Sequence, residues 1–448
     1  MRANPRIAAI TTLCELDKTR LPVSVIFERI DRQADLGQKD RQLAKKIVYG
    51  VLRNREYLDC LLKLLCRQPL NKLKPFVHQA LRSGLFQLFF LDRIPPSAAV
   101  NETVKAVKSK RYPSKVQGFV NGVLRESLRQ KQHLPGPEEP DNADRLILNH
   151  PAWLTDRWQK QHGRDEMIRI CRHNNLEPLL CLRTGSEEDQ AMLRETLVSQ
   201  GIEAVNGSYA PDSLILPGYH GKINDIEGID QGTVQVQDQA SQLASLLLGP
   251  FPSSLSCLDA CAGLGGKTTH LMSLLDSETS KVTAIEPDPR RFQLLEQNLK
   301  ARHLGCRVDT CNQSLQEFAG TGPSAFDRLL VDAPCSGTGV IGRHPDIRWN
   351  RREEELAAYR TRQLELLNLA APMLSPGGIL VYATCSIEAE ENSSVVEQFL
   401  TDNTDFTRTD CGEVLPPSCE SLIHDGYFTP LPDWGIDGFF CARLSKER

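Results

Sequence analysis

The chain has 448 residues, of which 40% are hydrophobic and 25% are charged, and its formal net charge at pH 7 is −4. At about 100–200 residues per domain, this length predicts about two to four domains. The sequence has no stretch of about 18 consecutive apolar residues and no apolar core of the signal-peptide type near its start, which argues against a membrane-spanning or secreted protein and predicts a cytoplasmic one.

Residues 5–130 carry apolar side chains at the three- and four-residue spacing of amphipathic helices, without the alternation typical of strands. We therefore predict an all-α domain over residues 1–133. This part holds 26 Lys and Arg residues against 11 Asp and Glu, whereas the rest of the chain has an acidic excess. A charge asymmetry of this size predicts that the helical domain binds a polyanion such as RNA.

Residues 134–144 are predicted to form a linker, because they include three prolines and a glycine. The next stretch, residues 145–236, mixes helical patterns with short strand candidates. These candidates lie at residues 179–183, 214–216 and 233–236. We interpret this stretch as a small α+β domain.

From residue 237 to residue 448, short apolar runs alternate with helical stretches, including those at 290–304 and 352–373. The apolar runs lie at residues 255–260, 281–286, 307–309, 326–332, 379–384 and 439–444. This alternation predicts an α/β domain with a doubly wound, mostly parallel sheet. Such sheets bind ligands beyond the carboxyl ends of their strands, so we expect the functional residues directly after the apolar runs.

The first candidate site reads DACAGLGGKTT over residues 259–269. Its glycines allow the backbone to approach a ligand at the start of a helix. The dinucleotide fingerprint is broken because Thr268 stands where its third glycine is required, and the P-loop is broken because Cys261 stands where its first glycine is required. Glu286 ends the next apolar run and can hold both hydroxyls of an adenosine ribose, so the pair indicates NAD or S-adenosylmethionine.

Two cysteines follow the later strands of the predicted sheet. Asp332 ends the run at 326–332 with Cys335 just beyond it, and Cys385 stands just beyond the run at 379–384. Adjacent strands of one sheet would bring these groups to the same rim. A single cysteine in such a place is more often a packing residue, but two, each flanked by small residues, indicate chemistry.

Residues 326–337, which read FDRLLVDAPCSG, and residues 384–386, which read TCS, resemble the signature of the RNA 5-methylcytosine methyltransferases. The resemblance extends to RHPD at 343–346 with Trp349, to EEN at 390–392 and to DGFF at 437–440. In the first part of the chain, VNE at 100–102 and FVNGVLR at 119–125 resemble a NusB-type RNA-binding domain. The whole chain is similar to the Sun or Fmu type of bacterial ribosomal small-subunit methyltransferases, which joins these parts.

The resemblance implies a Rossmann-like, S-adenosylmethionine-dependent domain that methylates carbon 5 of a cytosine in small-subunit (16S) rRNA. Carbon 5 is a poor nucleophile until a thiolate adds to carbon 6, and the family assigns this attack to the cysteine that stands here as Cys385. Asp332 would then hydrogen-bond or protonate N3, and Cys335 would help to remove the carbon 5 proton. We expect Lys267 to favour the anionic forms of these thiol and carboxyl groups.

For the cofactor, the resemblance implies binding by the glycine-rich loop, by Glu286 at the ribose and by Asp332. The loop residues are Cys261, Ala262, Gly263, Leu264, Gly265, Gly266 and Lys267. The family usually has Ala-Pro where this chain has Gly263 and Leu264, and an acid where it has Asn312. An asparagine can still exchange hydrogen bonds with an adenine amino group, so we expect Asn312 to contact the adenine.

Two alternatives come from other classes of protein. An NAD-dependent oxidoreductase is disfavoured by the broken fingerprint. A non-catalytic RNA-binding factor of the antitermination type, with a silent methyltransferase fold, has no need of both Cys335 and Cys385.

The target base must leave its stack, so the expected partner is single-stranded or splayed small-subunit rRNA. We expect no metal, since no Cys-x-x-Cys pair occurs. We also expect no membrane partner, and we expect the protein to be a monomer.

Overall fold

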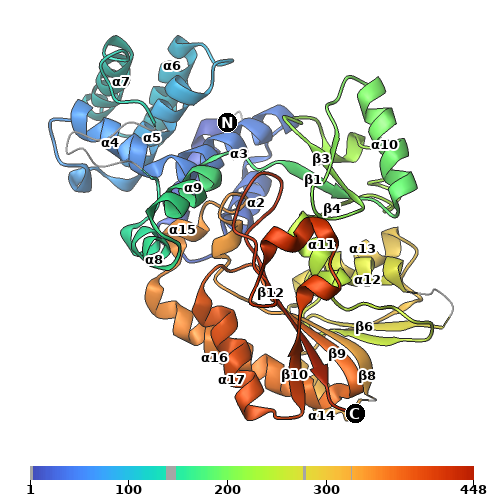
Figure 1. Cartoon of the computed structure of the whole chain (residues 1–448). Coiled ribbons are helices and arrows are strands. Elements are labelled where there is room, and N and C mark those ends of the chain that lie inside the picture. Colours follow the sequence, from blue (N-terminus) through green and yellow to red (C-terminus); the bar gives the residue numbers. More distant parts are fainter. Residues whose placement is uncertain (1–3, 138–147, 276–278, 324) are drawn as a thin grey trace. The chain divides into compact units, whose positions relative to one another are not determined.

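The computed structural model of the chain describes residues 4–137, 148–275, 279–323 and 325–448 (Figure 1). They form two compact units, one extending to Leu176 and including Ile341–Arg351, the other made of Glu177–Val340 and Arg352–Arg448. The predicted linker lies outside the described residues from residue 138 onward. The predicted domain boundaries stay a prediction, although the units divide the chain at other positions. No helix within the described ranges is long and apolar enough to cross a membrane.

The first unit begins with a bundle of helices. They are α1 (Pro5–Leu16), α2 (Val23–Ala34), α3 (Gln38–Arg53), α4 (Arg55–Leu65), α5 (Pro75–Phe90), α6 (Pro96–Ser109) and α7 (Ser114–Arg129). The Asn4 side chain accepts hydrogen bonds from the N–H groups of Arg6 and Ile7, and prolines stand in the first turn of α1, α5 and α6. Within the described residues 4–133 no strand interrupts the helices, which confirms the predicted all-α fold.

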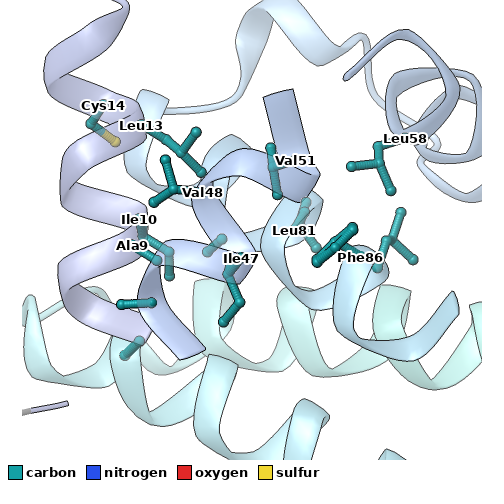
Figure 2. Close-up of a cluster of buried hydrophobic side chains, with 14 of the residues drawn as sticks. Ala9, Ile10, Leu13, Cys14, Ile47, Val48, Val51, Leu58, Leu81 and Phe86 are labelled. Carbon is teal, nitrogen blue, oxygen red and sulfur yellow. The ribbon is translucent and has the colours of Figure 1, made fainter. Parts of the chain in front are cut away.

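The bundle encloses an apolar core to which distant parts of the sequence contribute (Figure 2). Ile10 and Leu13 of α1, Ile47 and Val51 of α3, and Leu81 of α5 are all buried. Burial of each such side chain contributes about 1.5–3 kcal/mol. Packing of these amphipathic faces therefore holds the helices together.

The first unit also contains α8 (Ala152–His162), α9 (Arg164–Asn175) and the segment Ile341–Arg351, which we call the anchor segment. Its short helix α15 (Ile347–Asn350) carries Arg348, whose side chain is fully buried. Arg348 donates hydrogen bonds to the carbonyl oxygens of Asn149 (3.0 Å) and Asn174 (2.7 Å), and to Oδ1 of Asn175 (2.6 Å). Three oxygens thus pair with the two terminal nitrogens of a guanidinium that burial has removed from water.

The anchor segment also contacts the helical bundle. Trp349 donates a hydrogen bond from Nε1 to the carbonyl oxygen of Leu52 (2.8 Å), and its ring lies 5.1 Å from the guanidinium of Arg55. Asp346 accepts a hydrogen bond from the backbone N–H of Val23 at the start of α2 (3.0 Å). A piece of chain from the sequence of the α/β domain is therefore built into the helical unit.

The second unit contains two sheets, the smaller of which is antiparallel with strand order β2-β3-β1-β4. Its elements are β1 (Leu180–Arg183), α10 (Glu187–Ser199), β2 (Val205–Asn206), β3 (Ser213–Leu216) and β4 (Gln235–Val236). Leu193 and Leu197 of α10 pack with Leu182 and Leu214 of the sheet. The small α+β fold predicted for this region is confirmed.

The larger sheet has the order β11-β12-β13-β9-β8-β5-β6-β7, and β10 pairs with β13. Its strands are β5 (Ser256–Asp259), β6 (Lys281–Ile285), β7 (Val308–Cys311), β8 (Phe326–Asp332), β9 (Leu374–Thr384), β10 (Phe406–Thr409), β11 (Ile423–His424), β12 (Tyr427–Phe428) and β13 (Phe440–Lys446). Strands β5 to β9 pair in parallel, as predicted, whereas β13 is antiparallel to β9. The sheet is therefore mixed, and the sequence patterns missed the short strands β10, β11 and β12.

Helices cover both faces of this sheet. One core contains residues of α11 (Gln239–Leu246), α12 (Gly266–Leu274) and α13 (Pro289–Ala301), and the other contains residues of α14 (Leu315–Gly320), α16 (Leu356–Ala370) and α17 (Ser393–Asp402). In β8, Leu330 belongs to the first core, and Leu329 and Val331 to the second, because successive side chains of a strand point to opposite faces. Helices α16 and α17 lie side by side (Figure 1).

Candidate active site

The strand order of the larger sheet reverses at β5. This strand pairs in parallel with β6 on one side and with β8 on the other. Ligands of such sheets bind in the crevice at the carboxyl ends of the strands where the order reverses. The glycine-rich loop after β5 and the residues after β8 border this crevice.

The glycine-rich loop turns sharply from β5 into α12. Gly263 and Gly265 have φ angles of +59° and +86°, a conformation that residues with a Cβ atom rarely adopt. A Cβ atom on Gly265 would also lie 2.6 Å from Cδ1 of Leu295. Gly265 ends this turn and leaves the first N–H groups of α12 available to a ligand.

A cavity of about 740 Å³ occupies the crevice, and most of the predicted site residues line it. These are Cys261, Ala262, Gly263, Leu264, Gly266, Lys267, Glu286, Asp332, Cys335 and Cys385. Gly265 does not line the cavity, because its Cα faces Leu295. The structure therefore brings the glycine-rich loop, the ribose candidate and both cysteines to one place.

Asn312 is the second predicted residue that does not line the cavity. It follows β7 and donates a hydrogen bond from Nδ2 to the carbonyl oxygen of Glu286 (2.8 Å). In the structure, its side chain thus supports the turn that carries Glu286. The contact of Asn312 with an adenine stays a prediction.

Glu286 presents a fixed carboxylate at one end of the cavity. Its side chain is buried, and Oε1 accepts a hydrogen bond from the N–H group of Asp288 (2.9 Å). Oε2 lies 3.7 Å from the guanidinium of Arg291, another residue that lines the cavity. A carboxylate held in this way can accept hydrogen bonds from two neighbouring hydroxyl groups.

Lys267 and Asp332 form an ion pair at the middle of the cavity, with Nζ 2.7 Å from Oδ2. Burial disfavours the charged ammonium, but the carboxylate of Asp332, with smaller effects of Asp259 and Cys385, raises the pKa of Lys267 above its ordinary value. Lys267 is therefore a cation at neutral pH. Its charge offsets that of Asp332.

Asp259 ends β5 and is completely buried beside this pair. Burial raises the pKa of its carboxyl group to about 6, although Oδ2 accepts a hydrogen bond from the Thr268 hydroxyl (2.7 Å). Asp259 lines the cavity but was not among the predicted site residues, although it is the first residue of the glycine-rich motif.

The sulfur atoms of Cys335 and Cys385 lie 3.3 Å apart, close enough to share a proton. Cys385 directly follows β9, and Cys335 follows the neighbouring strand β8. The hydrogen bond with Cys385 and burial both raise the pKa of the Cys335 thiol. Cys335 is therefore a neutral thiol at neutral pH.

Cys261 is a third thiol of the cavity, but its surroundings make it inert. Burial, together with the charges of Asp259 and Asp332, raises its pKa far above the ordinary value. A neutral thiol packs as a small apolar group. Cys261 thus shapes the wall of the cavity, whereas the thiol pair carries the reactive sulfur.

Comparison with known proteins decides the family. Family models match three ranges: 16S rRNA methyltransferase RsmB/F at residues 246–445, the NusB family at 3–129, and an RsmF/B-like, ferredoxin-like domain at 150–220. The probable ribosomal RNA small subunit methyltransferase B of Bacillus subtilis is 32% identical over 452 residues, which cover 100% of this chain and 99% of that protein. The chain belongs to the ribosomal RNA small subunit methyltransferase B family.

Two further comparisons agree with this membership. The ribosomal RNA small subunit methyltransferase B of Sodalis glossinidius is 36% identical over 420 residues, which cover 93% of this chain and 92% of the relative. The crystal structure of PH0851 matches with a TM-score of 0.78 at 24% identity, and the match covers 100% of both chains. The relative from Sodalis glossinidius supports the same family assignment, and PH0851 shows the same fold along the whole chain.

Members of the ribosomal RNA small subunit methyltransferase B family depend on S-adenosylmethionine, and the cavity suits this cofactor. The positive φ angles of Gly263 and Gly265 bring bare backbone to the edge of the cavity, and the carboxylate of Glu286 matches a ribose diol. Asp332 and Lys267 line the same cavity as the thiol pair. A cofactor bound here would supply an electrophilic methyl group on a sulfonium.

Proposed function

We propose that this chain methylates carbon 5 of a cytosine in small-subunit (16S) rRNA through a covalent adduct between Cys385 and the base. The observation that carries this proposal is the pair of thiols, 3.3 Å apart, in the same cavity as the glycine-rich loop. Methylation of an atom that is already a good nucleophile has no need of a thiol. Two thiols at the reacting position favour a reaction with nucleophilic addition and later release.

The adduct forms when the Cys385 thiolate attacks carbon 6 of the cytosine. The new sulfur–carbon bond breaks the double bond between carbons 5 and 6, and N3 takes up the displaced charge. Asp332 is ionised in its pair with Lys267, so the proton that it delivers to N3 would come from the Lys267 ammonium through their hydrogen bond (2.7 Å), and this proton would neutralise that charge. Carbon 5 then carries enough electron density to accept a methyl group.

Release requires the loss of one proton from carbon 5. Cys335, after its own proton has passed to water, takes this proton; the electron pair restores the double bond between carbons 5 and 6, and the bond from carbon 6 to Cys385 breaks. The proton at N3 returns through Asp332 to Lys267, which restores their ion pair. We assign this role to Cys335 because its sulfur lies 3.3 Å from that of Cys385, next to the base that Cys385 would hold.

The RNA substrate is expected to meet two parts of the chain. The target base must be unstacked to reach a cavity in the sheet unit, which favours single-stranded or splayed rRNA. The NusB-like part, in which basic residues outnumber acidic ones 26 to 11 over residues 1–133, can contact phosphates without reading sequence. We propose that it holds the small-subunit rRNA while the cavity receives the cytosine.

The test is a pair of cysteine substitutions assayed with small-subunit RNA and labelled S-adenosylmethionine. Cys385→Ala should lower turnover by at least about a thousandfold while cofactor affinity is unchanged, because it removes only the nucleophile. Cys335→Ala should form the adduct but not release it, and a slower protein–RNA band should appear on a denaturing gel. Full turnover by Cys385→Ala would disprove the mechanism.

A further inference from the structure

A buried carboxylate joins the two loops that carry the thiols. Glu391 ends the short helix η6 (Ala389–Glu391), and its side chain is 0% exposed. Oε1 accepts hydrogen bonds from the N–H of Ser336 (2.8 Å) and from Nε2 of Gln363 (3.0 Å). Oε2 accepts hydrogen bonds from the hydroxyl groups of Ser336 and Ser386, the latter at 2.6 Å.

The two serines are the residues that directly follow the two cysteines. Ser336 follows Cys335, and Ser386 follows Cys385, so one carboxylate group binds both Cys-Ser steps. The serine hydroxyls lie 3.2 Å apart, and the sulfur atoms lie 3.3 Å apart. Each serine is joined to its cysteine by one peptide bond, so a change in the separation of the serines would be carried to the sulfur atoms.

The surroundings hold Glu391 itself in place. The Tyr382 hydroxyl donates a hydrogen bond to the carbonyl oxygen of Glu391 (2.6 Å). The next residue, Asn392, accepts a hydrogen bond from the Thr384 hydroxyl (2.6 Å) and donates one to the carbonyl oxygen of Ser386 (2.9 Å). The carboxylate therefore cannot shift without breaking bonds to β9 and to the loop after it.

Burial of a carboxylate costs free energy, so a carboxylate kept in such a place indicates that its position is needed. Asp332 has Lys267 as a counter-ion, but within the described residues no Lys or Arg forms an ion pair with Glu391. Burial raises the pKa of Glu391, against the effect of its hydrogen bonds. An apolar residue of similar volume would fill the space without that cost, but it would bind neither serine.

We propose that Glu391 is a positioning residue that fixes the distance between Cys335 and Cys385, so that adduct formation and adduct release both take place in one arrangement of the loops. This proposal rests on the proposed cysteine mechanism. Each sulfur acts on a different carbon of one bound base, so an error of about 1 Å at either sulfur can cost about a hundredfold in rate. We call the hydrogen bonds of Glu391 with Ser336 and Ser386 the clamp. Loss of the clamp should slow release more than attack, because Cys385 directly follows β9, whereas Cys335 stands three residues beyond β8 and would no longer be held beside carbon 5.

The test compares Glu391→Ala and Glu391→Gln in the full-length chain. Glu391→Ala should lower kcat by about ten- to a hundredfold without weakening cofactor binding, and it should accumulate covalent adduct although both cysteines are present. Glu391→Gln should recover most of the loss, because an amide of the same shape can accept from Ser336 and Gln363 while the serine hydroxyls turn to accept its N–H bonds. Glu397→Ala, an exposed position on α17, is the control and should behave as the unsubstituted chain.

Ser336→Ala combined with Ser386→Ala provides a second test if Glu391→Ala does not fold, since it removes only the two hydroxyl groups that bind the carboxylate. Adduct accumulation in this variant or in Glu391→Ala, with unchanged cofactor affinity, supports the clamp. If Cys335→Ala traps adduct but neither clamp variant exceeds the unsubstituted chain, the clamp is disproved and the cysteine mechanism stands. If Cys385→Ala turns over fully, the cysteine mechanism fails first.

Discussion

The glycine-rich loop at residues 261–267 and the anchor segment at 341–351 both follow strands of the larger sheet, but different forces shape them. The loop adopts its turn through its own backbone, with positive φ angles at Gly263 and Gly265. The anchor segment depends on side chains and carbonyl groups far away in sequence, among them Leu52, Asn149 and Asn174.

This difference decides what each segment reveals in the sequence. A glycine required by a left-handed backbone conformation is a local signal, because no other residue adopts it at similar cost. A buried arginine bound to distant carbonyls leaves no local signal, because its partners are backbone atoms that every residue carries. Changes in the loop should therefore act locally, and changes in the anchor segment should act on the whole first unit.

Removal of residues 1–133 should have the largest effect. The anchor segment would lose its hydrogen bonds with Leu52, Arg53 and Val23, each of which contributes about 1 kcal/mol. We expect trypsin to cut within residues 341–352 about a hundredfold faster than in the full chain. RNA binding should also weaken and depend less on salt. Equal cleavage rates in both proteins would show that the anchor segment keeps its folded structure without residues 1–133.

Arg348→Ala should have the second-largest effect. It leaves the buried oxygens of Asn149, Asn174 and Asn175 without their donor, so the free energy of unfolding should fall by about 3–5 kcal/mol. Urea unfolding of the full-length chain measures this change. Arg352→Ala, an exposed neighbour beyond the anchor segment, is the matched control and should change stability by less than about 0.5 kcal/mol.

The buried carboxyl group of Asp259, in the wall of the cavity, should make the stability of the protein depend on pH. Burial raises its folded-state pKa to about 6, above the ordinary value of 3.8 for an aspartate. Its protonated form therefore stabilises the fold below about pH 4, and that contribution is lost as the pH rises through 6. Between pH 4 and 7, this group alone should lower the free energy of unfolding by about 2–3 kcal/mol. Asp259→Asn should lack that fall, and parallel pH curves for the two proteins would contradict the assignment.

Gly265→Ala should have the smallest effect, about 1–2 kcal/mol of stability together with weaker cofactor binding. The cause is both the φ angle of +86° and the contact of the new Cβ atom with Leu295. Gly266→Ala is the matched control for stability, because no atom lies within 4 Å of a Cβ at that position. A thermal unfolding series with titration of S-adenosylmethionine measures both quantities, and equal losses in the two variants would place the strain outside the turn.

Much of the fold could be predicted from local patterns. The spacing of Ile10, Leu13, Ile47 and Val51 indicates helices with one buried face, and the apolar runs indicate the parallel strands. The short strands β10 to β12 escaped prediction because they are two to four residues long and take their partners from β13 and one another. Asn312 shows a limit of motif comparison. Its position in the sequence does not reveal that its amide donates a hydrogen bond to the carbonyl oxygen of Glu286.

By itself, the sequence determined which groups this protein brings to its sheet: the glycines of the loop, Asp332, and a cysteine after each of two strands. Their residue types and their places at strand ends are local properties, and the rule that parallel strands end at one edge gathers them. Only the tertiary structure decided the distance between the thiols, the burial of Glu391 between Ser336 and Ser386, and the place of Arg348 in the helical unit. These depend on packing between segments far apart in the chain, which no local pattern encodes.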